Sequence, residues 1–316
     1  MNGSGPLRVG VIGVGYLGRL HAQKLSSFPD IRFAGVCDAN SAHGEAVARE
    51  FGTTHFVRRS RLLAESDAVC IAVPTTAHYR VAMDAMKAGL HVLLEKPITA
   101  NLRQARALVR EAAERKLVFQ IGHVERFNPA MRHAASLIKE PRFIECHRMG
   151  PFGIRGTDVD VVLDLMIHDI DLILSFVRSP VARIQAVGVP VLSPNVDIAN
   201  ARIDFANGCT ANITASRVSS KKQRKIRVFQ EDGYISIDFL ERRIQVVRRA
   251  FPHGPDNPPE IAGEMHEAGE GGDSLRDEIR SFIDCVIGGK APVVSGVEGL
   301  AALELAFRVI RKMKRH

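Results

Sequence analysis

The sequence predicts an α/β chain of two domains, in which a doubly wound parallel sheet is followed by an α+β domain with an open, mainly antiparallel sheet. Short apolar runs alternate with amphipathic stretches as far as residue 122, which is typical of a parallel sheet covered by helices. Later apolar runs follow one another across short turns, which indicates an antiparallel meander. A length of 316 residues with 46% hydrophobic residues suits two packed cores. We place the domains at residues 1–124 and 125–316.

The elements of the first domain follow from the hydrophobic pattern. Leu7–Ile12 and Asp67–Val73 have the length and apolar character of buried strands, and the helix after the second should end at Gly89, a common residue beyond helix C-termini. Predicted strands are 7–12, 31–37, 53–57, 67–73, 91–94 and 118–121. Predicted helices are 16–27, 42–51, 77–88 and 101–116. The alternation predicts parallel strands joined by helices.

The second domain is predicted to contain more strand than helix. The helices are expected at 129–139, 161–177, 274–287 and 296–313. The strands are expected at 142–148, 182–189, 199–205, 209–216, 224–230, 234–239 and 243–249, and 253–272 is expected as a loop. An open sheet face must be covered, so we expect a homodimer or homotetramer through this sheet.

The net charge of +8 allows nucleic acid as a partner. However, basic and acidic residues are mixed along the chain. The one local excess comprises Arg217, Lys221, Lys222, Arg224, Lys225 and Arg227, with few aromatic residues nearby. A nucleic-acid surface usually adds stacking residues or a known reading motif. We therefore expect no nucleic-acid partner and interpret the cluster as a solvated strand and loop.

Cysteine content and hydropathy point to a reducing compartment. The chain has five cysteines, an odd number, and no Cys-x-x-Cys, which indicates free thiols rather than a disulfide framework. No apolar run reaches the roughly 18–20 residues of a membrane helix. Val9–Leu17 resembles a signal-peptide core, but no small-residue cleavage site follows it. We expect a cytoplasmic protein without a membrane partner.

Gly13-Val14-Gly15-Tyr16-Leu17-Gly18 is a G-x-G-x-x-G motif. It follows a predicted strand and opens a predicted helix, which is the context that a dinucleotide-binding motif requires. The first glycine permits a tight turn, the second lets the backbone approach a pyrophosphate, and the third lets helix and strand pack closely. The alternative is a glycine-rich turn without a ligand.

Asp38 ends the second predicted strand, at the usual distance from the motif for a residue that binds the adenosine ribose. Its carboxylate can accept hydrogen bonds from both ribose hydroxyls and would repel a 2′-phosphate. Ala39, Asn40, Ser41 and Ala42 follow, so no cation is close in sequence. We therefore expect NAD rather than NADP. A turn or helix-capping role for Asp38 stays open beside this one.

Lys96 lies in Glu95-Lys96-Pro97, directly after a strand that should belong to the sheet. The carboxyl edge of such a sheet is where cofactor and substrate meet, and a lysine there can stabilise developing negative charge. The alternative is a surface lysine before a helix.

Asp164 and His168 are four residues apart on an otherwise apolar helix, so they share one face. His168 is the better proton acceptor, and Asp164 can orient a hydroxyl or tune the histidine. A buried His–Asp pair that satisfies itself is the alternative, and Asp171 is a further carboxylate nearby. No third ligand at useful spacing suggests a metal, so none is expected.

Taken together, these motifs resemble the Gfo/Idh/MocA oxidoreductases over nearly the whole chain. The resemblance rests on the glycine motif, Asp38, Ala72-Val73-Pro74 with His78, Glu95-Lys96-Pro97, and Asp164-x-x-x-His168. It implies an N-terminal Rossmann domain, NAD(P)-dependent chemistry at a sugar or cyclitol carbon, and a C-terminal sheet used for oligomerisation. It assigns Lys96, Asp164 and His168 to the active site, with His168 as general base, and implies a cis Lys96–Pro97 peptide.

Cofactor contacts are expected at the glycine motif and at the neighbouring strand ends that the resemblance implies. These residues are Gly13, Val14, Gly15, Tyr16, Leu17, Gly18, Asp38, Val73, Pro74, Thr75, His78, Glu95 and Lys96.

A narrower resemblance concerns Gly122–Pro129 and Leu163–Leu172. These segments resemble the family's branch of UDP-N-acetylglucosamine 3-dehydrogenases, which make a 3-keto nucleotide sugar on a route to lipid A. A nucleotide diphosphate needs cations, and Arg126, Arg148 and Arg155 are candidates beside Asp164 and His168. Each arginine has the alternative of an ordinary ion pair.

The predicted reaction is oxidation of a ring hydroxyl at C3 of UDP-N-acetylglucosamine, with NAD as cofactor. His168 takes the hydroxyl proton, and Lys96 donates to the same oxygen. An inositol or other free-sugar dehydrogenase of the same family is one alternative. An NAD-dependent glycoside hydrolase or a non-catalytic NAD-binding regulator represents other classes.

Overall fold

The computed structural model describes residues 5–153, 159–250, 260–267 and 272–313. The chain divides into two compact units. One contains the residues up to Val124 together with Asp273–Ala301, and the other contains Glu125–Gly272 together with the residues from Ala302 on. Residues 273–301 thus group with the first unit, although the predicted second domain spans 125–316.

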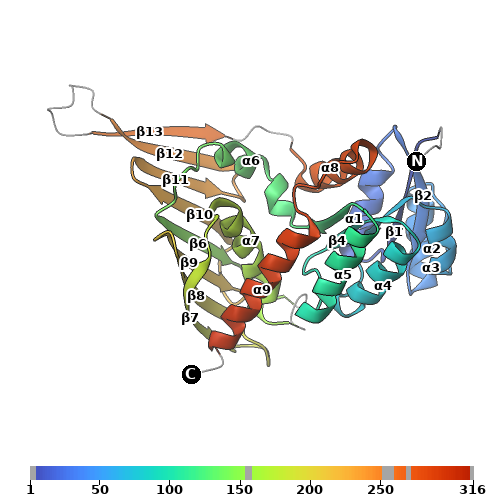
Figure 1. The fold of residues 1–316 in the computed structure, drawn as a ribbon, viewed down its shortest axis with the longest axis horizontal. Helices are drawn as coiled ribbons and strands as arrows, with labels where there is room; N and C mark the ends of the chain where they lie inside the picture. Colours follow the sequence, from blue (N-terminus) through green and yellow to red (C-terminus); the bar gives the residue numbers. More distant parts are fainter. Residues whose placement is uncertain (1–4, 154–158, 251–259, 268–271, 314–316) are drawn as a thin grey trace. The chain divides into compact units, whose positions relative to one another are not determined.

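The first unit is built on a five-stranded parallel sheet with the order β2-β1-β3-β4-β5. Strands β1, β2 and β4 of this sheet are labelled in Figure 1. The strands are β1 (Leu7–Ile12), β2 (Ile31–Cys37), β3 (Ala68–Ile71), β4 (His91–Glu95) and β5 (Phe119–Gly122). The helices before residue 124 are α1 (Tyr16–Leu25), α2 (Ser41–Glu50), α3 (Arg59–Ala64), α4 (Thr75–Lys87) and α5 (Leu102–Glu114). Strands β3 and β5 are buried along their whole length, which explains their continuous apolar character.

Helix α8 (Ser274–Gly288) belongs to the first unit because its apolar stripe completes a core there. Ile279, Phe282 and Ile283 lie in one buried cluster with Val9 of β1 and Leu25 of α1. An amphipathic helix shows in its sequence that one face is buried, but not against which sheet. Local sequence pattern therefore cannot show that this helix groups with the first unit rather than with the second.

Two local predictions in the first unit are wrong. Residues 53–57 form no strand, and only an isolated bridge joins His55 to Val36. The short helix α3 (Arg59–Ala64) follows, where no element was expected. Its buried Leu62 and Leu63 supply the apolar surface, but six residues are too few for a helical period to show.

The second unit is built on an eight-stranded sheet with the order β13-β12-β11-β10-β6-β9-β8-β7 (Figure 1). The strands are β6 (Phe143–Met149), β7 (Val181–Val189), β8 (Ile198–Phe205), β9 (Thr210–Ser216), β10 (Gln223–Gln230), β11 (Gly233–Asp238), β12 (Arg243–Ala250) and β13 (Glu260–Glu267). All pairs are antiparallel except β6 with β9, which confirms the predicted fold class.

Strand β13 corrects the prediction of a loop over 253–272, of which 253–259 and 268–271 lie outside the described residues. It pairs antiparallel with β12, so that Glu260 lies opposite Ala250 and Glu267 lies opposite Arg243. Its sequence, Glu-Ile-Ala-Gly-Glu-Met-His-Glu, is polar and contains a glycine, so backbone pairing at the sheet edge decides its conformation.

One face of the second sheet is apolar and the other is polar, as β8 shows. Ala199, Ala201 and Ile203 are buried, whereas Asn200 and Arg202 between them are not. The remaining helical elements are η1 (Val124–Phe127), α6 (Pro129–Ala135), η2 (Val162–Met166), α7 (Ile167–Phe176) and α9 (Gly296–Met313), of which α9 contributes to both units.

The predicted helix 161–177 is present, but its first part is not α-helical. Residues 162–166 form η2, a π-helical segment, and α7 continues from Ile167. Among the described residues, no helix combines the length and apolar character needed to cross a membrane.

Candidate active site

The glycine motif forms the turn between β1 and α1. Gly13 has φ +81°, and its N–H donates to the carbonyl of Cys37 at 2.8 Å. A Cβ atom on Gly18 would lie 1.8 Å from the carbonyl oxygen of Gly13, so the close approach of helix and turn requires glycine. A Cβ atom on Gly15 would meet no protein atom within 4 Å. Packing within the chain therefore does not explain glycine at position 15, whereas the close approach of a pyrophosphate would.

Asp38 is held against this turn by two backbone hydrogen bonds. Its Oδ2 accepts from the N–H of Val14 at 2.7 Å, and its Oδ1 accepts from the N–H of Asn40 at 2.8 Å. The N-cap of α2 is Asn40, whose side chain accepts from His43, so the capping alternative for Asp38 is not realised. Each carboxylate oxygen keeps further acceptor capacity, which suits ribose hydroxyls.

The loop after β3 lies against the glycine turn. A Cβ atom on Gly13 would be 2.7 Å from Cγ1 of Val73, and α4 begins two residues later at Thr75. Val73 and Thr75 are half-buried and Pro74 is exposed. The first unit thus brings the predicted cofactor residues Gly13, Asp38 and Val73 to one edge of its sheet, as parallel strands require.

His78 of α4 joins the loops after β3 and β4. It is 1% exposed, and its Nδ1 and Nε2 lie 2.9 Å from the carbonyl oxygens of Pro97 and Val73. Burial lowers the pKa of His78 more than these hydrogen bonds raise it. A neutral imidazole has one N–H and can donate to only one of the two carbonyls. Both ring nitrogens face the backbone, so His78 supports the loops that carry Val73 and Lys96.

Glu95 is a buried carboxylate at the end of β4. Its Oε1 lies 2.8 Å from Nε2 of His21, on the buried face of α1. Burial opposes its charge, but the hydrogen bond from His21 and the neighbouring positive charge of Lys96 outweigh burial and lower the pKa of Glu95. Sequence reasoning missed His21. The signal was a carboxylate at the end of a buried strand, which requires a nearby partner.

Lys96 follows Glu95 at the carboxyl end of β4 and is half-buried. The Lys96–Pro97 peptide is cis, which confirms what the family resemblance implied. This position, beside the loops that carry Gly13 and Val73, is where a sheet of this topology presents groups to a ligand.

Asp164 and His168 lie in the second unit, on η2 and on the first turn of α7. Both are half-buried, whereas Leu163, Met166 and Ile167 around them are buried. The change from π-helix to α-helix falls between the two residues. Such π-helical segments occur frequently at functional sites, although they are rare overall.

Arg148 of β6 forms a buried ion-pair triad with Glu125 and Asp169. Its Nη1 donates to Oε1 of Glu125 at 2.8 Å, and its Nη2 donates to Oδ1 of Asp169 at 2.8 Å. Its Nε donates to both oxygens of Asp169 at 3.1 Å. Burial opposes the charge on Arg148, but the two carboxylates raise its pKa above the usual value. The ion-pair alternative for this residue is therefore the one realised.

Arg126 is paired in the same way with Asp171 of α7. Its Nε donates to Oδ2 at 2.7 Å, and its Nη2 donates to Oδ1 at 3.1 Å. Asn128 caps α6 and donates to Glu125 at 3.3 Å, so Gly122–Pro129 and Leu163–Leu172 belong to one polar network. Asp169 and Asp171 follow His168 by one and three residues. Their ion pairs with Arg148 and Arg126 therefore hold the helix that carries His168. Arg155, the third predicted arginine, lies outside the described residues.

The catalytic candidates fall in both units, with Lys96 in the first and Asp164 and His168 in the second. Within the described residues, no group of three or more His, Cys, Asp or Glu side chains is arranged to hold a metal ion.

Two family models match the chain. One, described as an oxidoreductase family with an NAD-binding Rossmann fold, covers residues 7–123, and the other, described as a GFO/IDH/MocA C-terminal domain, covers residues 131–236. The UDP-N-acetylglucosamine 3-dehydrogenase of Acidithiobacillus ferrooxidans is 40% identical over 306 residues, which cover 96% of each chain. A solved structure of that enzyme has a TM-score of 0.91, with 38% identity over 98% of each chain. The scyllo-inositol 2-dehydrogenase (NAD(+)) of Bacillus subtilis is 27% identical, covering 95% of this chain and 92% of that relative.

Proposed function

Because the chain belongs to the Gfo/Idh/MocA family of oxidoreductases, we propose that it is an NAD-dependent dehydrogenase that oxidises UDP-N-acetylglucosamine at C3. The observation that carries the substrate is the 40% identity with the Acidithiobacillus enzyme over 96% of both chains. The inositol dehydrogenases, at 27% identity or less over most of their length, support the same chemistry on other ring hydroxyls.

The preference for NAD over NADP rests on Asp38. Its carboxylate is tied by hydrogen bonds to Val14 and Asn40, so it stays beside the glycine turn. A fixed negative charge there accepts ribose hydroxyls and disfavours a 2′-phosphate. The open space at Gly15 and the first turn of α1 fit the pyrophosphate of such a cofactor. When bound, NAD supplies the hydride acceptor.

The chain's own residues supply proton transfer and charge stabilisation. We assign His168 as the general base whose imidazole takes the proton of the C3 hydroxyl. Lys96 donates from Nζ to the same oxygen and stabilises its developing negative charge. Asp164 accepts a hydrogen bond from a substrate hydroxyl or from the histidine.

A substrate panel tests the proposal and its alternatives. UDP-N-acetylglucosamine, free N-acetylglucosamine and inositols would be compared by nicotinamide absorbance, with NAD and with NADP. We expect fast reduction of NAD with the nucleotide sugar and far lower kcat with the free sugar, because remote binding energy positions the reacting carbon. A preference for inositol favours the free-sugar dehydrogenase. Cleavage of a glycoside without net reduction favours the hydrolase, and NAD binding without turnover favours the regulator.

Assembly and compartment complete the proposal. We propose a homodimer or homotetramer formed through the polar face of the second sheet, on which Asn200 and Arg202 lie. Light scattering measures its mass directly. All five cysteines are buried and free, which suits the reducing cytoplasm.

A further inference from the structure

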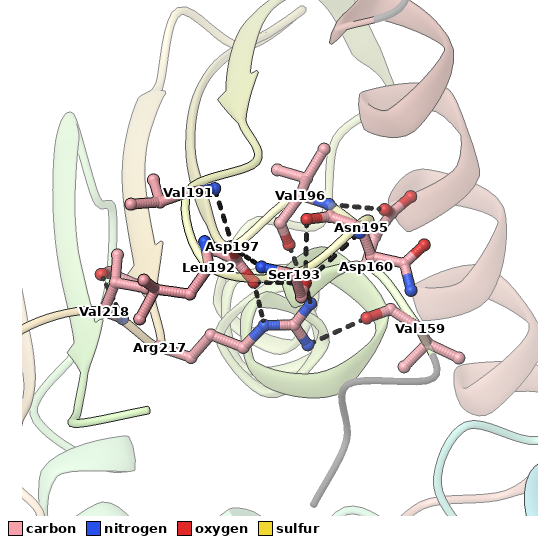
Figure 2. A network of polar contacts seen from close by, with 11 residues as sticks. Val159, Asp160, Val191, Leu192, Ser193, Asn195, Val196, Asp197, Arg217 and Val218 are labelled. Carbon is pink, nitrogen blue, oxygen red and sulfur yellow. Dashed lines mark hydrogen bonds and ion pairs between the residues drawn. The ribbon is translucent and has the colours of Figure 1, made fainter. Parts of the chain in front are cut away.

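Asp197, one residue before β8, is a buried carboxylate that accepts five hydrogen bonds (Figure 2). The N–H groups of Val191, Leu192 and Ser193 donate to Oδ2 at 2.8, 2.6 and 2.8 Å. The Ser193 hydroxyl and Nε of Arg217 donate to Oδ1, both at 2.7 Å. Burial alone would raise the pKa of Asp197, but these hydrogen bonds outweigh burial and hold it well below the usual range.

Arg217, which follows β9, extends the network to other segments (Figure 2). Its Nη1 donates to the carbonyl oxygen of Val159 at 2.9 Å, and its Nη2 donates to Oγ of Ser193 at 3.1 Å and to the carbonyl oxygen of Val196 at 3.3 Å. The side chain is 4% exposed. The expectation that Arg217 belongs to a solvated basic surface is therefore wrong, because its guanidinium has partners on two other segments, the loop before β8 and the residues before η2.

The same network reaches the backbone of Asp164. The N–H of Val196 donates to Oδ1 of Asp160 at 3.2 Å, and the carbonyl of Val196 accepts from the N–H of Val161 at 3.0 Å. The carbonyl of Asp160 in turn accepts from the N–H groups of Leu163 and Asp164, at 3.0 and 3.2 Å. A continuous set of hydrogen bonds thus runs from Asp197 to the first turn of η2.

The position of this network explains why it can affect chemistry. A helix N-terminus has N–H groups without intrahelical partners, and a π-helical turn is a minority conformation that surrounding contacts must favour. Here all three residues just before η2 have hydrogen bonds to other segments. Val159 accepts from Arg217, and both Asp160 and Val161 bind the backbone of Val196. The orientation of Asp164, in the middle of η2, depends on how that entry is fixed.

We propose that Asp197 and Arg217 are positioning residues, whose buried ion pair fixes the entry to η2 and thereby the orientation of Asp164. This proposal rests on the proposed function, in which Asp164 contacts the substrate or the general base. Arg217 is suited to the task because its planar guanidinium serves the carboxylate and two backbone carbonyls at once. A lysine could keep the charge but not all of these contacts.

The first experiment compares Arg217→Met, Arg217→Lys and the control Ile244→Val in the full chain, with UDP-N-acetylglucosamine and NAD. Ile244 is buried in β12, which contacts β11, β13 and α6 but is not in the network, so its variant reports a loss of stability alone. We expect Arg217→Met to lower kcat by about 10- to 100-fold, the range for a small misplacement of a reacting group. KM for NAD should change little. Arg217→Lys should recover thermal stability but not kcat, and Ile244→Val should keep kcat. Wild-type kcat in either Arg217 variant would overturn the proposal.

A double-mutant comparison with Asp164→Asn separates positioning from general damage. If Arg217 acts through Asp164, then Arg217→Met should lower kcat by less than about threefold in the Asp164→Asn background, because contacts in one network are not additive. Equal losses in the two backgrounds would overturn the proposal.

Hydrogen exchange supplies a readout that does not depend on substrate identity. It therefore distinguishes a failure of this positioning proposal from a failure of the proposed function. In Arg217→Met, the amides of Val161, Leu163 and Asp164 should exchange at least about tenfold faster, whereas those of β12 should not change. Unchanged exchange at these three amides would overturn the proposal, whether or not the nucleotide sugar is the substrate.

Discussion

Replacing Arg148 with methionine distinguishes an ion-pair role from a phosphate-binding role. Arg148 is 3% exposed, and its three guanidinium nitrogens all donate to Glu125 or Asp169. Methionine has a similar length but no charge, so the two buried carboxylates would lose their common counter-ion. Removing one partner of a buried ion pair costs about 3–5 kcal/mol of unfolding free energy. For a unit of this size, that loss corresponds to a fall of about 6–20 °C in the unfolding temperature.

The assay is calorimetric or circular-dichroism unfolding of wild type, Arg148→Met and the double variant Arg148→Met/Asp169→Asn. The double variant removes positive and negative charge together, so it should recover part of the lost stability. Two units need not unfold together, so the transition assigned to the second unit is the one to follow.

A different result would refute this reasoning. If Arg148 served the diphosphate of the substrate, Arg148→Met would keep the wild-type unfolding temperature, and its KM would rise for UDP-N-acetylglucosamine but not for a free sugar. We expect the opposite, namely an unstable variant in which any change of KM is the same factor for the nucleotide sugar and for the free sugar.

Three further predictions follow from the site. Asp38→Ser should narrow the preference for NAD, measured as the ratio of kcat/KM with NAD and NADP, and a wild type that already prefers NADP would contradict the assignment. Lys96→Ala and His168→Ala should each lower kcat by about 10²–10⁴-fold. Calorimetry should show unchanged NAD affinity in His168→Ala. Near-normal turnover of His168→Ala across the pH range would show that His168 is not the general base. Because the pKa of Asp197 is lowered in the folded chain, its contribution to stability is full above the unfolded pKa of about 3.9 and is lost as the pH falls further. Denaturation should therefore show Asp197→Asn destabilised at pH 7 and closer to wild type near pH 3, and an equal difference at both pH values would contradict this linkage.

Local pattern was sufficient where one short segment decides the structure. The strands of the first sheet are short apolar runs. Asp38 binds Val14 across 24 residues, but the spacing of a known motif connects the two. The cis peptide at Lys96–Pro97 came from family resemblance rather than from the residues themselves. Local pattern did not show η2, because five π-helical residues produce no period that differs visibly from an α-helix.

Long-range pairing accounts for most of what sequence reasoning did not predict. Arg148 lies 23 residues from Glu125 and 21 from Asp169, and no spacing rule connects a strand residue to them. Arg217 looked solvated because its neighbours in sequence are basic, yet its carboxylate partner is 20 residues away, next to β8. A charged residue in a sequence shows that a partner is needed if it is buried, but burial itself is a property of the fold.

The most direct test of the central claim is the fate of the hydrogen at C3. The enzyme would be given UDP-N-acetylglucosamine carrying deuterium at C3 together with NAD, and the nicotinamide and sugar products would be analysed by mass spectrometry. The account predicts one deuterium in the reduced nicotinamide for each 3-keto nucleotide sugar formed, and a loss of this transfer in His168→Ala. Reduced nicotinamide without deuterium, or deuterium retained at C3 of the product, would contradict oxidation at that carbon.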